Sequence, residues 1–144
     1  MTTLSLSRDA VTVLGLAGTA LPFALSIEDE VERWLRPLRL YGESGAALQG
    51  MGVSEARGEA SVEVPTRQSS SSPEETLHII TMAASKLAAD RGASSVDTLD
   101  ILSAVMAHYG EAFQRALEGH AGDFSELAHR MADRTADGRR GQAS

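Results

Sequence analysis

The sequence of 144 residues predicts an all-α fold, built from two similar helical units that a polar linker joins. Apolar residues recur at steps of three and four along several stretches, which is the spacing of one buried helix face. Most of these stretches begin at a Ser or an Asp, and both residues cap helix N-termini well. Aromatic residues make up only 4% of the chain, whereas strands favour aromatic and β-branched side chains. These observations favour packed helices over a β-sandwich.

Composition limits the functions that the chain can have. A net charge of −7 provides no basic field to meet phosphates, so we expect no nucleic-acid partner. The absence of cysteine excludes disulfides, thiol catalysis and thiolate metal sites, and it fits the reducing conditions of the cytoplasm. At 144 residues, the chain has room for one domain with a core of its own.

Residues 10–25 form an apolar run that invites a membrane interpretation. The run is shorter than the roughly 20 apolar residues that span a bilayer, and Gly15, Gly18 and Pro22 interrupt it. A signal peptide would need a positive leader, but the charge of Arg8 is offset by the next residue, and no clear cleavage site follows. We therefore expect a core helix, without a membrane partner.

Two helices are predicted in the first part of the chain. Ser7 caps the first, which should end at Pro22. Ser26 caps the second, and Pro37 should kink or shorten it near Arg33, because proline removes a donor and crowds the preceding turn.

A short helix over residues 44–49 and a turn at residues 50–52 should follow. Residues 54–72 have little hydrophobic periodicity and close with a run of serines, so they are predicted to be a surface linker. This linker could hold a brief extended piece at residues 62–64.

The second half begins with the strongest helix signal in the chain. Ser72 can cap free N–H groups, Pro73 suits the first helical position, and the acidic residues after it oppose the positive helix end. Gly92 should end this helix, and Asp97 or Thr98 should start the next one. The apolar stripes of the two helices are Leu77, Ile80, Ala84 and Leu87, and Leu99, Leu102, Val105 and Met106.

Two further helices are predicted over residues 112–119 and 124–133, followed by a flexible tail over residues 135–144. The predicted domain thus spans residues 1–134.

The two halves share a sequence pattern. Tyr41-Gly42-Glu43 recurs as Tyr109-Gly110-Glu111, an offset of 109 − 41 = 68 residues. At this offset several apolar or capping positions align, namely Asp29 with Asp97, Trp34 with Leu102, Leu38 with Met106, and Leu14 with Met82. Near the ends of the units, Gly52-Val53 aligns with Gly122-Asp123 when the alignment is shifted slightly from the offset of 68 residues. We therefore expect two packed copies, over residues 5–53 and 73–133, with the linker 54–72 between them.

These segments resemble the Clp repeat, a four-helix unit that occurs twice in the N-terminal domain of Clp-type AAA+ unfoldases. The resemblance covers roughly residues 5–133 and is clearer in the second half. It departs from the family pattern at Leu99-Asp100, where the family has Glu-His, and at Pro37. The segments that carry it are Ser72-Pro73, residues 79–87, residues 96–105, Tyr109-Gly110-Glu111, Ala121-Gly122-Asp123, Leu6-Ser7-x-x-Ala10 and Met51-Gly52-Val53.

No catalytic constellation is evident. The chain lacks the Gly-Lys-Ser/Thr ending of a phosphate-binding loop, so the AAA+ motor is absent from this sequence. The four histidines form no HExxH pair, and we expect neither a metal nor a cofactor. Asp97 is interpreted as a cap and Asp100 as an exposed position beyond it. The acidic residues Glu28, Asp29, Glu30 and Glu32 are interpreted as a solvated helix start.

The resemblance implies a non-catalytic protein-interaction module that binds substrate proteins, adaptors or peptide ligands, with a Clp-type protease system among the implied partners. The groove would lie near the two helix starts, at Leu6, Arg8, Val13, Glu74, Glu75, Leu77 and Ile80. For Val13 and Ile80 a place in the core is the better interpretation. Two alternatives stay open: an oligomerisation subunit of a larger assembly, and an enzyme whose site no motif marks. The sequence does not define the oligomeric state.

Overall fold

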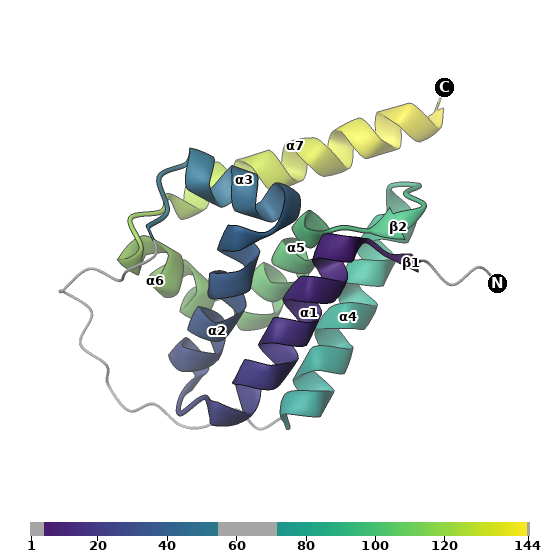
Figure 1. Cartoon of the computed structure of the whole chain (residues 1–144). Helices are drawn as coiled ribbons and strands as arrows, with labels where there is room; N and C mark the ends of the chain where they lie inside the picture. Colours follow the sequence, from purple (N-terminus) through teal and green to yellow (C-terminus); the bar gives the residue numbers. More distant parts are fainter. Residues whose placement is uncertain (1–4, 55–71, 144) are drawn as a thin grey trace.

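The computed structural model describes residues 5–54 and 72–143, with side chains up to Arg134 (Figure 1). The described part of the chain is mostly helical, which confirms the predicted all-α class. The predicted linker, with its extended piece at residues 62–64, lies almost wholly outside the described residues. The elements in chain order are β1 (Ser5–Leu6), α1 (Arg8–Ala20), the 3-10 turn η1 (Leu21–Phe23), α2 (Ile27–Leu40), α3 (Gly42–Gly50), α4 (Pro73–Asp90), β2 (Ser95–Val96), α5 (Thr98–Tyr109), α6 (Glu111–Gly119) and α7 (Phe124–Ala143).

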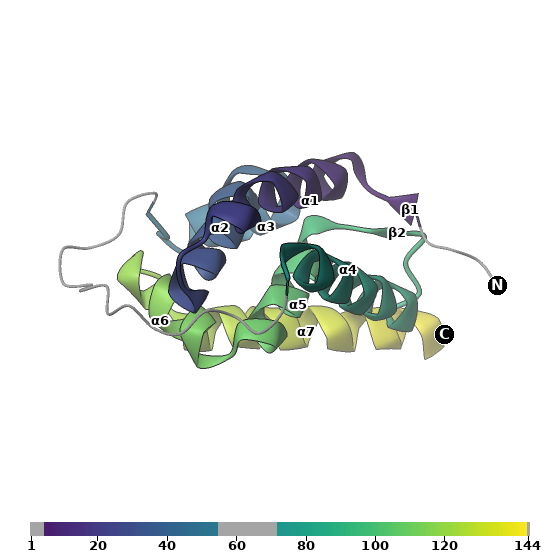
Figure 2. The same cartoon turned by 90° about the horizontal axis from the view of Figure 1, so that it is seen from below.

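The helices form two layers. Figure 2 shows α1, α2 and α3 on one side of the molecule and α4 to α7 on the other. The layers meet where α1 packs beside α4, α2 against α5 and α6, and α3 against α5. A single apolar core fills the space between them, and its largest fully buried side chains are Trp34, Phe113, Leu38, Leu48, Ile80, Ile101, Leu102, Leu117 and Leu127.

Four helix starts have the predicted caps. The hydroxyls of Ser7, Ser26 and Ser72 each accept a hydrogen bond from the backbone N–H three residues later, at 3.1, 3.0 and 3.1 Å. Asp97 caps α5 in the same way, and the Asp100 carboxylate accepts in return from the Asp97 N–H. Local sequence therefore sets these helix boundaries.

Pro37 does not end α2 near Arg33, so the predicted shortening is wrong. The helix continues to Leu40, and the Tyr41 N–H donates to the Pro37 carbonyl at 3.1 Å. The proline falls in the last turn, where only a few intrahelical bonds remain to be lost. It is also buried in the core beside Leu38. Tertiary packing thus outweighs the local cost of the proline.

The structure has two features that the sequence did not predict. α7 continues to Ala143 rather than ending at Asp133, so it enters residues 135–144, where we expected a flexible tail. The strands β1 and β2 pair in parallel, with Ser5 opposite Ser95 and Leu6 opposite Val96. This short pairing ties the start of α1 to the start of α5.

The apolar run at residues 10–25 forms α1, η1 and part of the connection to α2. Ala10, Val13, Leu14 and Ala17 make up the buried side of α1, as expected of a core helix. None of the helices in the described ranges has the length and apolar character needed to cross a bilayer.

Substitution of Gly42 tests the close packing between α3 and α5. Gly42 has φ +67°, and a Cβ there would lie 2.6 Å from Thr98 Oγ1. That hydroxyl accepts a buried hydrogen bond from the Ser44 N–H at 3.0 Å. We expect Gly42→Ala to lower the free energy of unfolding by about 2 to 3 kcal/mol, because backbone strain and the clash add.

Gly52→Ala is the matched control, because Gly52 also has positive φ but no heavy atom within 4 Å of the position that a Cβ would occupy. It should cost about 1 kcal/mol in denaturant unfolding, from strain alone. Equal losses for both variants would contradict close packing of Gly42 against Thr98.

Candidate interaction surface

The seven residues predicted to line a groove do not form one surface. Val13 and Ile80 are fully buried, which matches the core role favoured for them. Leu6 lies half-buried in β1, and Leu77 packs half-buried against α1, with Cδ2 3.2 Å from where a Cβ on Gly18 would sit. The charged members Arg8, Glu74 and Glu75 are exposed.

The helix directions explain why these residues are separated. Figure 1 shows α1 and α4 side by side and antiparallel, and the contact of Leu77 with Gly18 places the start of α4 at the end of α1. Arg8 at the start of α1 therefore lies at the opposite end of the pair from Glu74 and Glu75. A single site at both helix starts does not exist in this geometry.

The exposed apolar side chains mark a different surface. Most of the large exposed ones lie on α1, η1, the connection after η1, and α4, and only one lies on α2. Among the described residues these are Val11, Leu16, Phe23, Leu25, Ile79 and Met82, with Leu40 on α2. Contiguous exposed apolar area on a soluble domain commonly marks a binding surface.

Phe23 and Leu25 are the most exposed of this group, at 69% and 81%. Polar side chains of α2 nevertheless hold their backbone in place. The Leu25 N–H donates to Asp29 Oδ2 at 2.9 Å, and Arg33 Nη2 donates to the Phe23 carbonyl at 3.3 Å. Asp29 and Arg33 also pair with each other at 3.4 Å. The backbone that carries these two exposed apolar side chains is thus held by hydrogen bonds from α2.

The outer sides of α1 and α2 continue this surface. Leu16, 46% exposed, lies on α1, seven residues before Phe23 of η1. On α2, Arg36 and Leu40 are exposed and follow Arg33 at helical steps. We call Leu16, Phe23, Leu25, Arg33, Arg36 and Leu40 the α1–α2 face.

A second exposed stripe runs along α4. Glu75, Ile79 and Met82 follow one another at steps of four and three and are all exposed. Glu74 lies beside them in the first turn of the helix. We call these four residues the α4 face.

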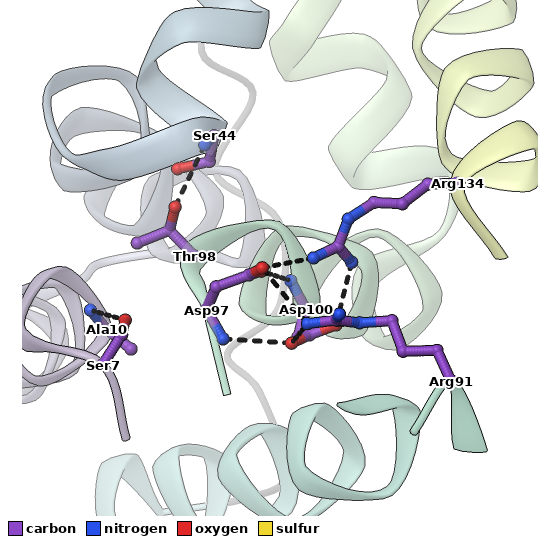
Figure 3. Close-up of polar contacts among 8 residues, drawn as sticks. All are labelled: Ser7, Ala10, Ser44, Arg91, Asp97, Thr98, Asp100 and Arg134. Atoms are coloured by element: carbon purple, nitrogen blue, oxygen red, sulfur yellow. Dashed lines mark hydrogen bonds and ion pairs between the residues drawn. The ribbon is translucent and has the colours of Figure 1, made fainter. Parts of the chain in front are cut away.

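Asp97 and Asp100, the carboxylates that could have suggested a catalytic site, form hydrogen bonds and ion pairs that join helices (Figure 3). Asp100 is 1% exposed, so its predicted exposure is wrong. It accepts hydrogen bonds from Arg91 at 2.7 and 3.0 Å and from Arg134 at 2.9 Å, and both arginines also pair with Asp97. The cluster joins the end of α4, the start of α5 and α7.

Burial alone would raise the pKa of Asp100. The hydrogen bonds from Arg91, the Asp97 N–H and Arg134 outweigh burial and lower that pKa below its usual value. Asp100 therefore stays ionised. Its carboxylate oxygens accept hydrogen bonds from two guanidinium groups and a backbone N–H, so it is not available as a base.

The glutamates at the start of α2 also differ from the solvated face that we expected. Glu30 is buried and accepts from the Tyr109 hydroxyl at 2.9 Å, and Glu28 pairs with Arg115 at 2.8 Å. Glu32 lies 2.6 Å from the buried ring of His120. Alternate residues of one helix thus bind three partners in the second half of the chain.

The environment of Glu30 is unfavourable for its charge. Burial raises the pKa of Glu30, the hydrogen bond from Tyr109 opposes this, and the nearby Asp29 adds to it. Burial and the adjacent carboxylate likewise raise the pKa of Tyr109. Trp34 donates its indole N–H to the Tyr109 hydroxyl at 3.2 Å. Glu30, Trp34 and Tyr109 thus connect α2 with α5.

No cluster of three or more His, Asp or Glu side chains that could hold a metal ion occurs among the described residues. No protein-family model, no curated protein and no solved structure matches the chain. The assignment of a function therefore rests on the surface itself.

Sequence reasoning missed Phe23 and Leu25 because they extend an apolar run that otherwise enters the core. The available signal was Pro22, which ends the helix and lets the next residues leave its buried side.

The pH dependence of stability tests the Asp100 cluster. A carboxyl group whose pKa is lowered by folding contributes stability above its unfolded pKa, and this contribution is lost as the pH falls. We expect Asp100→Asn to lower the free energy of unfolding by about 3 kcal/mol at pH 7, and the gap from wild type to narrow below about pH 4.

Asp133→Asn serves as the control, because Asp133 is 67% exposed in its pair with His129. It should change stability by less than about 0.5 kcal/mol. A constant gap between Asp100→Asn and wild type from pH 7 to pH 3 would argue against an ionised, paired Asp100.

Proposed function

We propose that the chain is a non-catalytic protein-interaction module that binds other proteins through the α1–α2 face. The observation that carries the proposal is the exposed pair Phe23 and Leu25 on a backbone that Asp29 and Arg33 hold in place. Exposure of two large apolar side chains lowers solubility, so a fixed and exposed pair is best explained by a partner that covers it. Leu16, also exposed, adds apolar area on α1.

The proposal includes a double Clp-like repeat. Its support is local: Gly42 and Gly110, which align at the offset of 68, both have positive φ, at +67° and +56°. In addition, α3 and α6 end with the same hydrogen bonds, from Met51 and Val53 to the Leu48 carbonyl and from His120 and Gly122 to the Leu117 carbonyl. These hydrogen bonds align Gly52 with Ala121, whereas the sequence comparison aligned Gly52 with Gly122, one residue further along the chain.

In the Clp family such a domain receives proteins for a motor that follows it. By that resemblance, the partners would be substrate proteins, adaptors or peptide ligands, and a Clp-type protease system is the setting in which such a domain acts. An oligomerisation role is the second candidate, and the presence of another exposed apolar stripe on α4 favours it.

Affinity capture from a lysate tests the proposal. The variant that carries both Phe23→Ser and Leu25→Ser should recover at least tenfold less of the proteins that wild type captures, because the anchors of the face are gone. Both positions are largely exposed, so the variant should keep the circular dichroism and melting temperature of wild type.

Val11→Ser is the matched control. Val11 is 54% exposed on α1 and is not among the residues of the α1–α2 face, so it is an apolar surface residue outside the proposed site. It should capture the same proteins as wild type. Equal recovery by all three proteins would refute binding at the α1–α2 face.

A further inference from the structure

The two exposed faces have complementary chemistry. The α1–α2 face combines the apolar groups of Leu16, Phe23 and Leu25 with the exposed guanidinium group of Arg36, while Arg33 already pairs with Asp29. The α4 face combines the carboxylates of Glu74 and Glu75, in the first turn, with the apolar side chains of Ile79 and Met82, and the exposed Lys86 follows one turn after Met82. Opposite charges beside apolar patches orient two surfaces and exclude wrong pairings.

These faces cannot meet within one molecule. Leu77 of α4 contacts α1 at Gly18, whereas Arg33 of α2 contacts the carbonyl of Phe23, in the η1 turn that follows α1. α1 packs against both α2 and α4 and lies between them in the view of Figure 1. The faces are free to pair only between different molecules.

We propose that the α4 face of one copy of this chain docks on the α1–α2 face of a second copy. Ile79 and Met82 would cover Phe23 and Leu25, and Glu75 would approach Arg36. Because the two surfaces differ, the contact is heterologous, and each copy keeps one unused face to which a further copy can add. The chain carries a net charge of −7, so local charge complementarity has to overcome general repulsion, and the association is weak.

This inference uses the surface of the proposed function but does not require a foreign partner. A second copy and a foreign protein would compete for the α1–α2 face. The proposed function is tested with dilute protein in a lysate, whereas self-association is tested with pure protein, so either one can fail while the other holds.

Sedimentation velocity of the pure, full-length chain gives the test. Between about 1 μM and about 1 mM, the weight-average mass of wild type should rise without stopping at the dimer. Leu25→Asp and Met82→Asp each disable one face, and each variant alone should form no species larger than a monomer. Both side chains are exposed, and circular dichroism verifies that the variants fold.

An equimolar mixture of these two variants is the decisive sample. The intact α4 face of Leu25→Asp can dock on the intact α1–α2 face of Met82→Asp, so the mixture should form dimers and nothing larger. A two-fold symmetric dimer would use both faces in every copy, so wild type would stop at the dimer, which would overturn the proposal.

Charge reversal supplies a second measurement. Arg36→Glu and Glu75→Arg should each reduce the association at least tenfold, and the chain that carries both changes should recover most of it. A monomeric wild type at all concentrations would overturn the proposal and leave the α1–α2 face to a different protein. Association that neither face variant changes would overturn it as well.

Discussion

The packing of α2 against both halves of the chain is the constraint on which the rest of the structure depends. Trp34, its largest side chain, is fully buried and donates to Tyr109 at the end of α5. Glu30 accepts from the same hydroxyl at 2.9 Å. Truncating a buried tryptophan to alanine typically lowers the free energy of unfolding by about 3 to 5 kcal/mol. Here the truncation would also remove the N–H that donates to the Tyr109 hydroxyl oxygen. The contacts of α2 thus hold the two layers together.

The same helix connects the core with the surface. While its inner side fixes the two layers, Asp29 and Arg33 on its outer side hold the backbone of the η1–α2 connection. Phe23 and Leu25 are therefore displayed by a rigid support rather than by a free loop. A site built on a helix that is anchored in the core keeps its geometry without a partner, which favours binding.

The sequence predicted those features that neighbouring residues determine. Ser7, Ser26 and Ser72 identify helix starts because each cap bonds to a backbone group three residues away. The role of Glu30 escaped prediction because its partner Tyr109 lies 79 residues away. The burial of Asp100 escaped prediction because it depends on Arg91, which follows the preceding helix, and on Arg134, 34 residues away. A carboxylate next to a helix start is interpreted as solvated unless its distant partner is known. The candidate groove failed for a similar reason: periodicity reveals buried faces but not the antiparallel arrangement of α1 and α4.

Photocross-linking inside cells that produce the protein would test most directly whether the α1–α2 face binds other proteins. A photoreactive phenylalanine analogue replaces Phe23 in one variant and Val11 in another, and adducts are resolved by mass. The structure predicts discrete adducts with other proteins from position 23 and at least tenfold fewer from position 11. Adducts of equal yield from both positions, or none from position 23, would contradict a binding role for this face.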